Sequence, residues 1–234
     1  MWPSGKAPGF GLGIPRFESW HLRFLRFIIR RIKILEGIAS IILAGGKGER
    51  MKSDLPKVLH PLRGRPLISH VTESLRSAGI DDIYIVVGFK GDAVIDALGP
   101  SFHYVWQRQQ LGTGHAVMQA ESAFEGYTGR IIVACGDVPL IRPATFRKLV
   151  EMSDEPDVKA AVLTMKLENP FGYGRIITDG TDGFVRIVEE KDASPEEKLV
   201  SEVNTGTYIF DREYLFSGLK RINNSNAQGE YYLP

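Results

Sequence analysis

The residues best suited to chemistry begin with a glycine-rich loop that follows an apolar run. The run IASIILA ends at Ala44, and the next residues are GGKGER. Closely spaced glycines allow backbone N–H groups to surround an anion, while Lys47 and Arg50 add positive charge. The loop fits neither G-x-x-x-x-G-K-[ST] nor G-x-G-x-x-G. A plain strand-to-helix turn with solvated cations is the alternative, but three glycines with two cations favour a phosphate site.

A lysine that follows a proline comes next along the chain. In Leu55-Pro56-Lys57 the proline stiffens the backbone, so the ammonium group is delivered to a fixed place. Lysine is a compact point charge that suits a phosphate on which charge accumulates during a reaction. Taken alone, Pro-Lys is an ordinary surface dipeptide, so this motif gains meaning only beside the glycine loop.

A glutamine before a second glycine motif is a candidate for reading a nucleobase. Gln107 is followed by Gly112-Thr113-Gly114. A side-chain amide offers both a donor and an acceptor, as the edge of a base requires. We expect the glycines to let the chain pack flat against a planar ring. A lone glutamine at a strand end is usually a surface residue, and the neighbouring glycines shift that balance.

An aspartate at the end of an apolar run is a candidate metal ligand. Asp137 follows Cys135 and Gly136, and Val138-Pro139 continue the chain. Mg²⁺ prefers one or two carboxylates plus substrate phosphates over a complete protein cage. The alternative is that Asp137 caps the next helix, although Pro143 suggests that this helix begins later.

Three later motifs offer the groups that hydrogen-bond sugar hydroxyls, namely carboxylates, amides and bare backbone. They are Gly172-Tyr173-Gly174-Arg175, Glu189-Glu190-Lys191 and Asn204-Thr205-Gly206. Each alone is equally compatible with turn chemistry or a solvated face. Their order and spacing, together with the earlier motifs, favour a site.

Composition excludes several classes of protein. Apolar residues make up 43% of the 234 residues and charged ones 24%, which is typical of a globular chain with a sizeable core. The formal net charge of +1 argues against a general nucleic-acid surface. The one cysteine, Cys135, excludes an intrachain disulfide and fits a reducing, cytoplasmic compartment. We interpret it as a small strand-end residue rather than a nucleophile.

The first 37 residues differ in character from the rest. They are rich in Gly, Pro and Trp and then basic, and HLRFLRFIIRRIKIL is amphipathic at helical spacing. A membrane-surface helix or a targeting peptide is conceivable, but no apolar run is long enough to span a membrane. We interpret them as an atypical extension that is either non-native or mis-started, with the functional domain covering residues 38–230.

From Ile38 onward, predicted strands and helices alternate. Strands are expected at 38–44, 82–88, 103–107, 130–137 and 158–167, and helices at 66–79, 91–99, 115–124 and 143–152. After residue 168 we expect a hairpin, a short capped helix, a strand at 203–211 and a final helix. This order predicts an α/β fold with a mostly parallel sheet and a smaller β-rich lobe. Ligands bind such sheets at the carboxyl ends of the strands, where the three unusual loops lie.

The series LAGGKGERM…DLPKVL, QLGTGHA, GDVPLI, NPFGYGRI, VEEKDA, VNTG and NNSNAQGEYY resembles one enzyme family. It is similar to the nucleotidyltransferase half of the bacterial bifunctional N-acetylglucosamine-1-phosphate uridyltransferase/glucosamine-1-phosphate acetyltransferases, over nearly all of residues 38–233. The glycine loop and Pro-Lys are shared by sugar-nucleotide pyrophosphorylases broadly, whereas QLGTGHA, GYGRI and NAQGEYY are more specific. The resemblance implies a Rossmann-like, glycosyltransferase-A-like fold. It also implies the reaction of UTP with N-acetylglucosamine-1-phosphate, which yields UDP-N-acetylglucosamine, a cell-wall and lipopolysaccharide precursor, and pyrophosphate.

The resemblance also implies roles for particular residues. Asp137 and Asn226 match the pair of Mg²⁺ ligands, Lys57 the phosphate-contacting lysine, and Arg50 a second cation on the triphosphate. The residues implied to bind substrate are Leu43, Ala44, Gly45 and Gly46 in the loop, Gln107, Gly112 and Thr113 at the uridine, Cys135 and Gly136 beside Asp137, and Gly174, Glu189 and Asn204 at the sugar.

The sequence departs from the family pattern at several points. Cys135 stands where some relatives carry Tyr, and Glu49 stands where Thr is common, which places a negative charge near a phosphate site. No hexapeptide-repeat β-helix follows, so we expect residues 231–234 to begin a truncated linker and expect neither acetyltransferase activity nor a trimer. A pyrophosphorylase for another sugar phosphate or NTP, or a non-catalytic nucleotide-sugar-binding fragment, remains the alternative.

Overall fold

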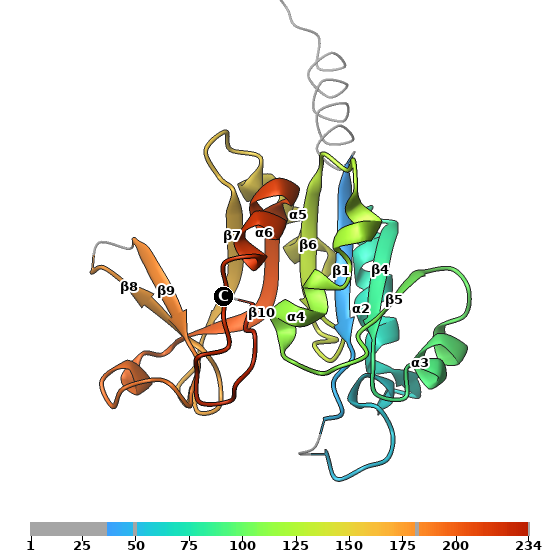
Figure 1. Cartoon of the computed structure of the whole chain (residues 1–234), viewed down its shortest axis with the longest axis horizontal. Coiled ribbons are helices and arrows are strands. Elements are labelled where there is room, and N and C mark those ends of the chain that lie inside the picture. Colours follow the sequence, from blue (N-terminus) through green and yellow to red (C-terminus); the bar gives the residue numbers. More distant parts are fainter. Residues whose placement is uncertain (1–36, 49–50, 181–182, 234) are drawn as a thin grey trace, which may run out of the picture. The chain divides into compact units, whose positions relative to one another are not determined.

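The computed structural model describes residues 37–48, 51–180 and 183–233. Within them, an eight-stranded sheet has the order β5-β4-β1-β6-β10-β8-β9, with β7 paired to β10 (Figure 1). The strands are β1 Ile38–Ala44, β4 Asp82–Val87, β5 His103–Trp106, β6 Arg130–Cys135, β7 Ala160–Lys166, β8 Arg175–Thr178, β9 Phe184–Val188 and β10 Glu202–Asp211. A two-residue ladder joins β2 Pro61–Leu62 to β3 Arg65–Pro66. The helices are α2 Leu67–Ala78, α3 Gly91–Leu98, α4 Thr113–Met118, α5 Pro143–Ser153 and α6 Arg212–Leu219.

The first half of the sheet is parallel and buried on both faces. Strand β1 pairs in parallel with β4 and with β6, and β4 pairs in parallel with β5. Ile38 and Ile42 of β1 pack into one core cluster, while Ala39 and Ile41 pack into the other. A strand covered on both faces has no solvent side, which explains why IASIILA is almost continuously apolar.

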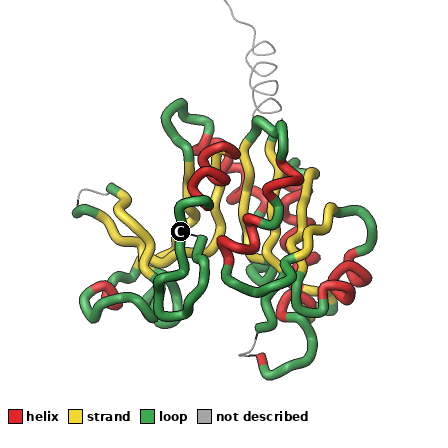
Figure 2. Tube along the Cα trace, viewed as in Figure 1, coloured by secondary structure: helices red, strands yellow, loops and turns green. Residues whose placement is uncertain are grey.

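Helices cover the two faces of this half. Buried side chains of α2 and α5 join the first cluster, and those of α4 and α6 join the second. Each fully buried Ile, Leu or Phe in such a cluster contributes about 1.5–3 kcal/mol relative to exposure. The sheet is therefore the middle of three layers (Figure 2), and it holds the loops at its edges in fixed positions.

The second half of the sheet is antiparallel and depends on one long strand, β10. Its residues Tyr208–Asp211 pair with β6, whereas Val203 pairs with Arg175 of β8. Strand β7 pairs along the other side of β10, and its register shifts between Asn204 and Thr207. The irregular stretch of β10 thus lies between the part that pairs with β8 and the part that pairs with β6.

The predicted α/β class and β-rich lobe are confirmed, with some changes in the elements. The sheet is mixed, because β7 and β10 run antiparallel to their neighbours. The helix predicted at 115–124 begins at Thr113 as α4, ends at Met118, and is followed by a separate 3-10 turn, Glu121–Phe124. Pro66 precedes α2 as its N-cap residue, and Gly79 ends it in the left-handed region, at φ 92°.

The capped helix predicted near residue 194 is a 3-10 turn, Glu197–Leu199. The backbone N–H of Ser194 donates to the Glu197 carboxylate at 2.9 Å, and the N–H of Glu197 donates to the Ser194 hydroxyl at 3.2 Å. This reciprocal pair is a capping box, and it explains why SPEE starts a helical turn.

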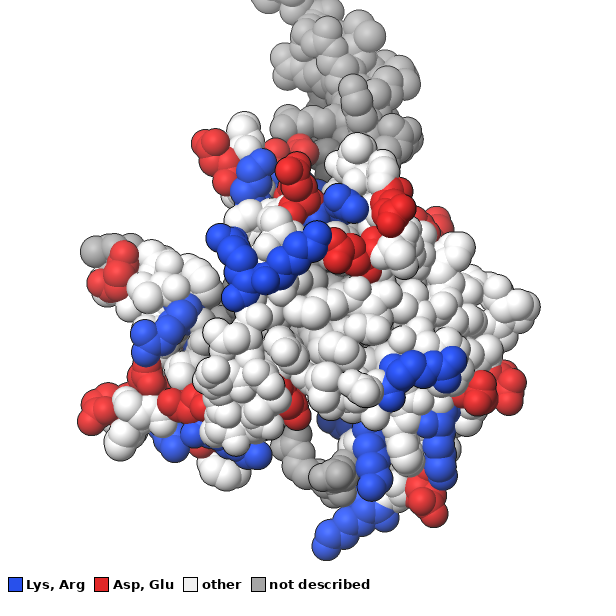
Figure 3. Space-filling model, in the orientation of Figure 1, with Lys and Arg blue, Asp and Glu red and all other residues white. Residues whose placement is uncertain are grey.

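The loops after β1 and β6 leave the parallel strands at their carboxyl ends, at the lower edge in Figure 1. Charged side chains of both signs are interspersed on the face shown in Figure 3, with uncharged surface between them. None of the described helices is long and apolar enough to cross a membrane. The predictions for residues 1–36, Glu49, Arg50 and Pro234 concern positions outside the described residues.

Candidate active site

A cavity of about 490 Å³ lies at the carboxyl ends of the parallel strands. The glycine loop, the Pro-Lys segment, the loop after β5 and the end of β6 all contribute to it, as does the C-terminal segment. Its lining residues are Leu43, Ala44, Gly45, Gly46, Lys47, Gly48, Lys57, Val58, Gln107, Gln110, Gly112, Thr113, Ala116, Cys135, Asp137 and Glu230. The structure therefore brings together the predicted residues of the loop, the lysine, the glutamine and the aspartate.

Two glycines of the loop allow close approaches that a side chain would block. A Cβ on Gly45 would lie 2.7 Å from Oε1 of Gln107. Gly48, at φ 67°, faces Lys57, where an added Cβ would lie 2.7 Å from the lysine Cβ. The glycine loop and the lysine segment consequently lie against each other. Arg50, the other predicted cation of this loop, falls outside the described residues.

Lys57 and Asp137 form an ion pair within the cavity. The ammonium Nζ contacts Oδ2 of Asp137, and their side chains are 37% and 22% exposed. Lys57 begins a 3-10 turn directly after Pro56, and the next two residues, Val58 and Leu59, are buried. The buried pair anchors the turn, so the lysine side chain is directed by the fold rather than left free on the surface.

The end of β6 contributes Asp137 together with Cys135. Burial raises the pKa of the Cys135 thiol to about 12, with Asp137 acting in the same direction and Lys57 opposing it. The protonated thiol lies 3.6 Å from the Gly206 carbonyl, to which it can donate. The thiol therefore lacks the thiolate character that a nucleophile needs. Gly136, between the two cavity residues, donates its N–H to Leu43 O at 3.0 Å and holds β6 against β1.

The Gly-Thr-Gly motif packs against the C-terminal segment of the described chain. The N–H of Gly114 donates to Tyr231 O and the N–H of Tyr231 donates to Leu111 O, both at 2.8 Å. A Cβ on Gly112 would lie 2.5 Å from Tyr231 O, and one on Gly114 would lie 2.9 Å from Tyr232 O. These glycines therefore admit another stretch of backbone, while Gly112 and Thr113 also line the cavity, and the contact with a planar ring stays a prediction.

The predicted sugar-binding residues Gly174, Glu189 and Asn204 also lie together. The Asn204 N–H donates to Gly174 O at 2.8 Å, and a Cβ on Gly174 would lie 2.9 Å from Oε1 of Glu189. Burial raises the pKa of Glu189, with smaller contributions from Asp192 and Glu230. None of these three residues lines the cavity that contains Asp137. Their cluster lies where β8, β9 and the irregular part of β10 meet.

Asn226, the predicted second metal ligand, lines a different cavity, of about 280 Å³, together with Glu189 and Asp192. Its Oδ1 accepts hydrogen bonds from the N–H groups of Gln228 and Glu230 at 3.2 Å, and its Nδ2 donates to Glu230 O at 2.6 Å. The Glu230 side chain lines the larger cavity. Asn226 is therefore linked to that cavity through its hydrogen bonds to the backbone of Glu230.

Nucleotidyltransferases of this kind generally use a divalent metal ion, and Asp137 suits one chemically. Its carboxylate is a hard oxygen donor in a cavity able to admit phosphates. Lys57 now neutralises that carboxylate, and both lone pairs of the Asn226 oxygen are engaged. No cluster of three or more acidic, His or Cys residues suited to a metal occurs in the described parts of the chain. A site built from one or two protein ligands plus substrate oxygens is consistent with this arrangement.

Sequence reasoning did not select four residues that line the cavity, Val58, Gln110, Ala116 and Glu230, of which Gln110 and Glu230 are polar. Gln110 donates through Nε2 to Gln107 O at 3.0 Å, so it supports the backbone of Gln107 at the cavity. Glu230 belongs to the GEYY segment, where a carboxylate next to two tyrosines could have indicated a binding residue. Its place in the cavity follows from the packing of Tyr231 on the Gly-Thr-Gly loop and from the hydrogen bonds of Asn226 to its backbone.

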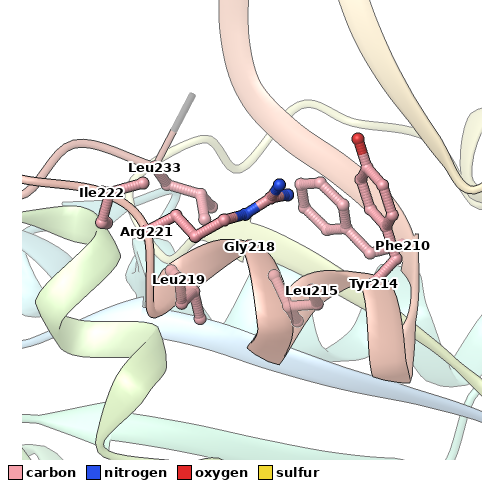
Figure 4. A pocket seen from close by; sticks show the side chains of 8 residues that line it. All are labelled: Phe210, Tyr214, Leu215, Gly218, Leu219, Arg221, Ile222 and Leu233. Atoms are coloured by element: carbon pink, nitrogen blue, oxygen red, sulfur yellow. The ribbon is translucent and has the colours of Figure 1, made fainter.

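Another hollow, of about 330 Å³, lies on α6 and contains none of the predicted site residues. Phe210, Leu215, Leu219, Ile222 and Leu233 give it a mostly apolar lining, with Arg221 beside them (Figure 4). It lacks phosphate-binding loops and acidic groups, so the chemistry belongs to the larger cavity.

The fold, together with a cavity lined by the glycine loop, Lys57 and Asp137, is that of a nucleotidyltransferase. The model of a family described as the MobA-like NTP transferase domain matches residues 40–180, more than half of the chain, and the chain belongs to this family. It is similar to curated proteins named Bifunctional protein GlmU. That of Oceanobacillus iheyensis is 50% identical over 195 residues, 83% of this chain and 43% of the relative. That of Geobacter metallireducens is 51% identical over 199 residues, 84% of this chain and 42% of the relative. The chain spans less than half the length of these relatives.

Solved structures show the same fold. A UDP-glucose pyrophosphorylase complexed with UDP-glucose superposes with a TM-score of 0.69 at 20% identity, covering 83% of each chain. A Bacillus anthracis structure assigned as a glucose-1-phosphate thymidylyltransferase gives 0.64 at 29% identity, covering 79% of this chain and 75% of the other.

Proposed function

We propose that the chain transfers a uridylyl group from UTP to N-acetylglucosamine-1-phosphate, giving UDP-N-acetylglucosamine and pyrophosphate. The observation that carries the proposal is the single cavity in which the glycine loop, Lys57, Gln107 and Asp137 meet. The choice of this sugar phosphate rests on the motifs QLGTGHA, GYGRI and NAQGEYY and on the similarity to the GlmU proteins.

In the proposed reaction a phosphate oxygen of the sugar phosphate attacks the α-phosphorus of UTP in line and expels pyrophosphate. The attacking phosphate is already ionised, so no residue need act as a general base. Catalysis then consists of positioning and charge neutralisation. Lys57 offsets charge on the triphosphate and on the departing pyrophosphate, and we assign Arg50 the same role. Backbone N–H groups of the glycine loop hold the phosphates that leave.

Mg²⁺ is the proposed cofactor, with Asp137 as its ligand in the cavity and Asn226 as the second ligand implied by the family resemblance. When bound, it would neutralise charge shared by the sugar phosphate and the α-phosphate. Gln107, Gly112 and Thr113 would contact the uridine. Gly174, Glu189 and Asn204 would hold the sugar. The reaction uses soluble substrates, in keeping with the cytoplasmic location that the one cysteine favours.

A pyrophosphate-release assay across a panel of sugar 1-phosphates and NTPs tests the proposal. We expect turnover to be fastest with UTP and N-acetylglucosamine-1-phosphate in the presence of Mg²⁺. Faster turnover with another pair would assign a different pyrophosphorylase activity. Tight binding of UDP-N-acetylglucosamine without turnover of any pair would assign a non-catalytic nucleotide-sugar-binding protein instead.

A further inference from the structure

Gln107 has a side-chain amide whose orientation is fixed by its neighbours. The side chain is 4% exposed and lies at the end of β5, next to the cavity. Its Nε2 lies 3.1 Å from the Gly112 carbonyl oxygen and 3.1 Å from Nδ1 of His115. A carbonyl oxygen only accepts, so the amide nitrogen must face it. The two hydrogens of the amide are therefore directed at Gly112 and His115.

The second of these bonds requires His115 to accept at Nδ1. A neutral imidazole accepts at one nitrogen and donates at the other, so its hydrogen is on Nε2. Nε2 lies 3.2 Å from the side-chain nitrogen of Gln119, whose other contact is the His115 carbonyl oxygen of its own helix, also at 3.2 Å. The half-buried Gln119 can turn its amide oxygen to Nε2–H and give up its bond to the His115 carbonyl, because solvent can replace that bond. The buried Gln107 has no solvent to replace its bond to the Gly112 carbonyl, so its amide keeps this orientation.

With both amide hydrogens engaged, Oε1 of Gln107 is left as an acceptor at the glycine loop. It lies 2.7 Å from the position that a Cβ on Gly45 would take, and Gly45 lines the cavity. No described group donates a hydrogen bond to this oxygen. Gly45 therefore leaves the room that a ligand atom needs in order to reach it.

An oxygen acceptor at this place distinguishes pyrimidines by the atom at ring position 3. Uracil and thymine carry an N–H there, whereas cytosine carries a lone pair that would face the amide oxygen. A site with a fixed acceptor therefore binds uracil and thymine more favourably than cytosine, because the buried amide oxygen would have no hydrogen-bond donor opposite cytosine. A glutamine free to turn would accommodate both.

We propose that His115 is a positioning residue that holds the Gln107 amide with its oxygen toward the cavity, so that the site selects a pyrimidine with an N3–H. The proposal rests on the proposed function, in that the cavity is taken as the nucleotide site. His115 itself touches no reacting atom. It acts through Gln107 and belongs to α4, the helix that begins at Thr113.

The test compares UTP and CTP in three variants. His115→Leu removes the acceptor, His115→Asn places an amide oxygen near the position of Nδ1, and His103→Leu changes an exposed histidine on β5 as a control. We expect His115→Leu to raise KM for UTP with little change in kcat, and to narrow the UTP:CTP preference in kcat/KM roughly tenfold or more. His115→Asn should restore most of the preference, and His103→Leu should leave it unchanged.

Two measurements need no turnover. Titration calorimetry should show that the difference in affinity between UTP and CTP is smaller in His115→Leu than in the wild type. ¹⁵N NMR of the nucleotide-free wild type should show the His115 hydrogen on Nε2. An unchanged UTP:CTP preference in His115→Leu, or a hydrogen on Nδ1, would overturn the proposal. If His115→Leu does not fold, a folded His115→Asn that loses the preference overturns it equally.

The two proposals fail in distinguishable ways. A wild-type protein that turns over no sugar phosphate, yet binds UTP more tightly than CTP through His115, would remove the proposed reaction and keep this inference. If the protein turns over UTP but substitutions at His115 leave the UTP:CTP preference unchanged, the proposed reaction stands and the inference about His115 is wrong.

Discussion

At the scale of single residues, the contact between Lys57 and Asp137 matters most. Both were selected for phosphate and metal chemistry, and the fold brings their charged groups into an ion pair. In the proposed reaction, a triphosphate and a cation that bind together would separate the pair, because Lys57 would contact phosphate and Asp137 the cation. In the structure without substrate, the two side chains neutralise each other.

Replacing Asp137 by Ala is expected to lower uridylyl transfer by at least about a hundredfold, since the cavity loses its candidate metal ligand. The fold should survive, because the side chain lies at the cavity surface. Pyrophosphate release and thermal unfolding measure the two effects. Asp96→Ala, an exposed change on α3, is the control. Unchanged turnover of Asp137→Ala with Mg²⁺ would refute the metal assignment.

Replacing Lys57 by Met is expected to strengthen Mn²⁺ binding by the nucleotide-free protein, because the Asp137 carboxylate is no longer neutralised. The same change should weaken UTP binding, because the triphosphate loses a cation. Titration calorimetry measures both affinities. Lys47→Met removes a cavity cation that is not paired with Asp137 and controls for general charge. Equal Mn²⁺ affinities in the two variants would show that the ion pair is irrelevant to metal binding.

At the scale of elements, the C-terminal segment is as much a part of the site as the glycine loop. Residues 230–233 pack along the Gly-Thr-Gly loop through the Tyr231 hydrogen bonds and through Leu233, whose N–H donates to the Thr113 hydroxyl at 2.9 Å. This packing places Glu230 in the cavity. The loop after β5 and the C-terminal segment therefore position each other.

Gly112→Ala is expected to displace the C-terminal segment and to reduce turnover, because the added Cβ would meet backbone atoms of Tyr231 at 2.5 and 2.8 Å. Gly99→Ala and Gly126→Ala share the cost of a positive φ, about 1–3 kcal/mol, but have nothing within 4 Å of the added atom. We expect Gly112→Ala to be the most destabilising of the three in chemical denaturation. Equal losses would show that backbone strain alone decides the effect.

The hairpin β8–β9 is joined to the following loop by Arg175 and Glu190. Arg175 is 1% exposed, and its Nη2 donates to Oε2 of Glu190 at 2.7 Å. The Gly172 N–H donates to the same oxygen at 3.0 Å. The Gly172 hydrogen bond, followed by the bond from Arg175, lowers the pKa of Glu190. This carboxylate therefore stabilises the lobe only while it is ionised.

Glu190→Gln is expected to lower Tm at neutral pH, and its difference from wild type should shrink in acid. The pKa of Glu190 is lower in the folded than in the unfolded chain. The stabilisation is therefore complete above the ordinary value of 4.5 and is lost as pH falls below it. Thermal unfolding from pH 7 to pH 3 measures this, with exposed Glu168→Gln as the control. A difference that persists undiminished at pH 3 would contradict the assignment.

At the scale of the whole molecule, the long strand β10 joins the nucleotide half to the hairpin lobe. One end pairs with residues 130–133 of β6, and the other pairs with Arg175 of β8, next to the cluster of Gly174, Glu189 and Asn204. The register shift near Gly206 occurs between these pairings, and the Gly206 carbonyl contacts the Cys135 thiol. The strand thus connects the two sets of predicted binding residues.

A chain that begins at Gly37 is expected to retain full activity and Tm, because we assign the functional domain to residues 38–230. Pyrophosphate release and thermal unfolding, compared with the full chain, test this. A loss of either property in the shortened protein would make residues 1–36 part of the functional unit. Mass spectrometry of the native N-terminus addresses whether they are translated.

The sequence alone determined the parallel half of the sheet and the loops after β1, β5 and β6, which form most of the cavity. IASIILA and RIIVAC predict buried parallel strands, and ligand loops follow the carboxyl ends of such strands. These are local signals, because burial on both faces and turn chemistry are written in neighbouring residues.

Only the tertiary structure decided which side chains meet. The sequence spacing does not predict that Lys57 pairs with Asp137 or that Gln107 bonds to His115. Nor does it predict that Glu230 lines the larger cavity while Asn226 lines a different one. The direction of β7 and β10 was likewise settled by pairing across the sheet. A strand's apolar pattern fixes which faces are buried, but its neighbour and direction depend on distant chain segments.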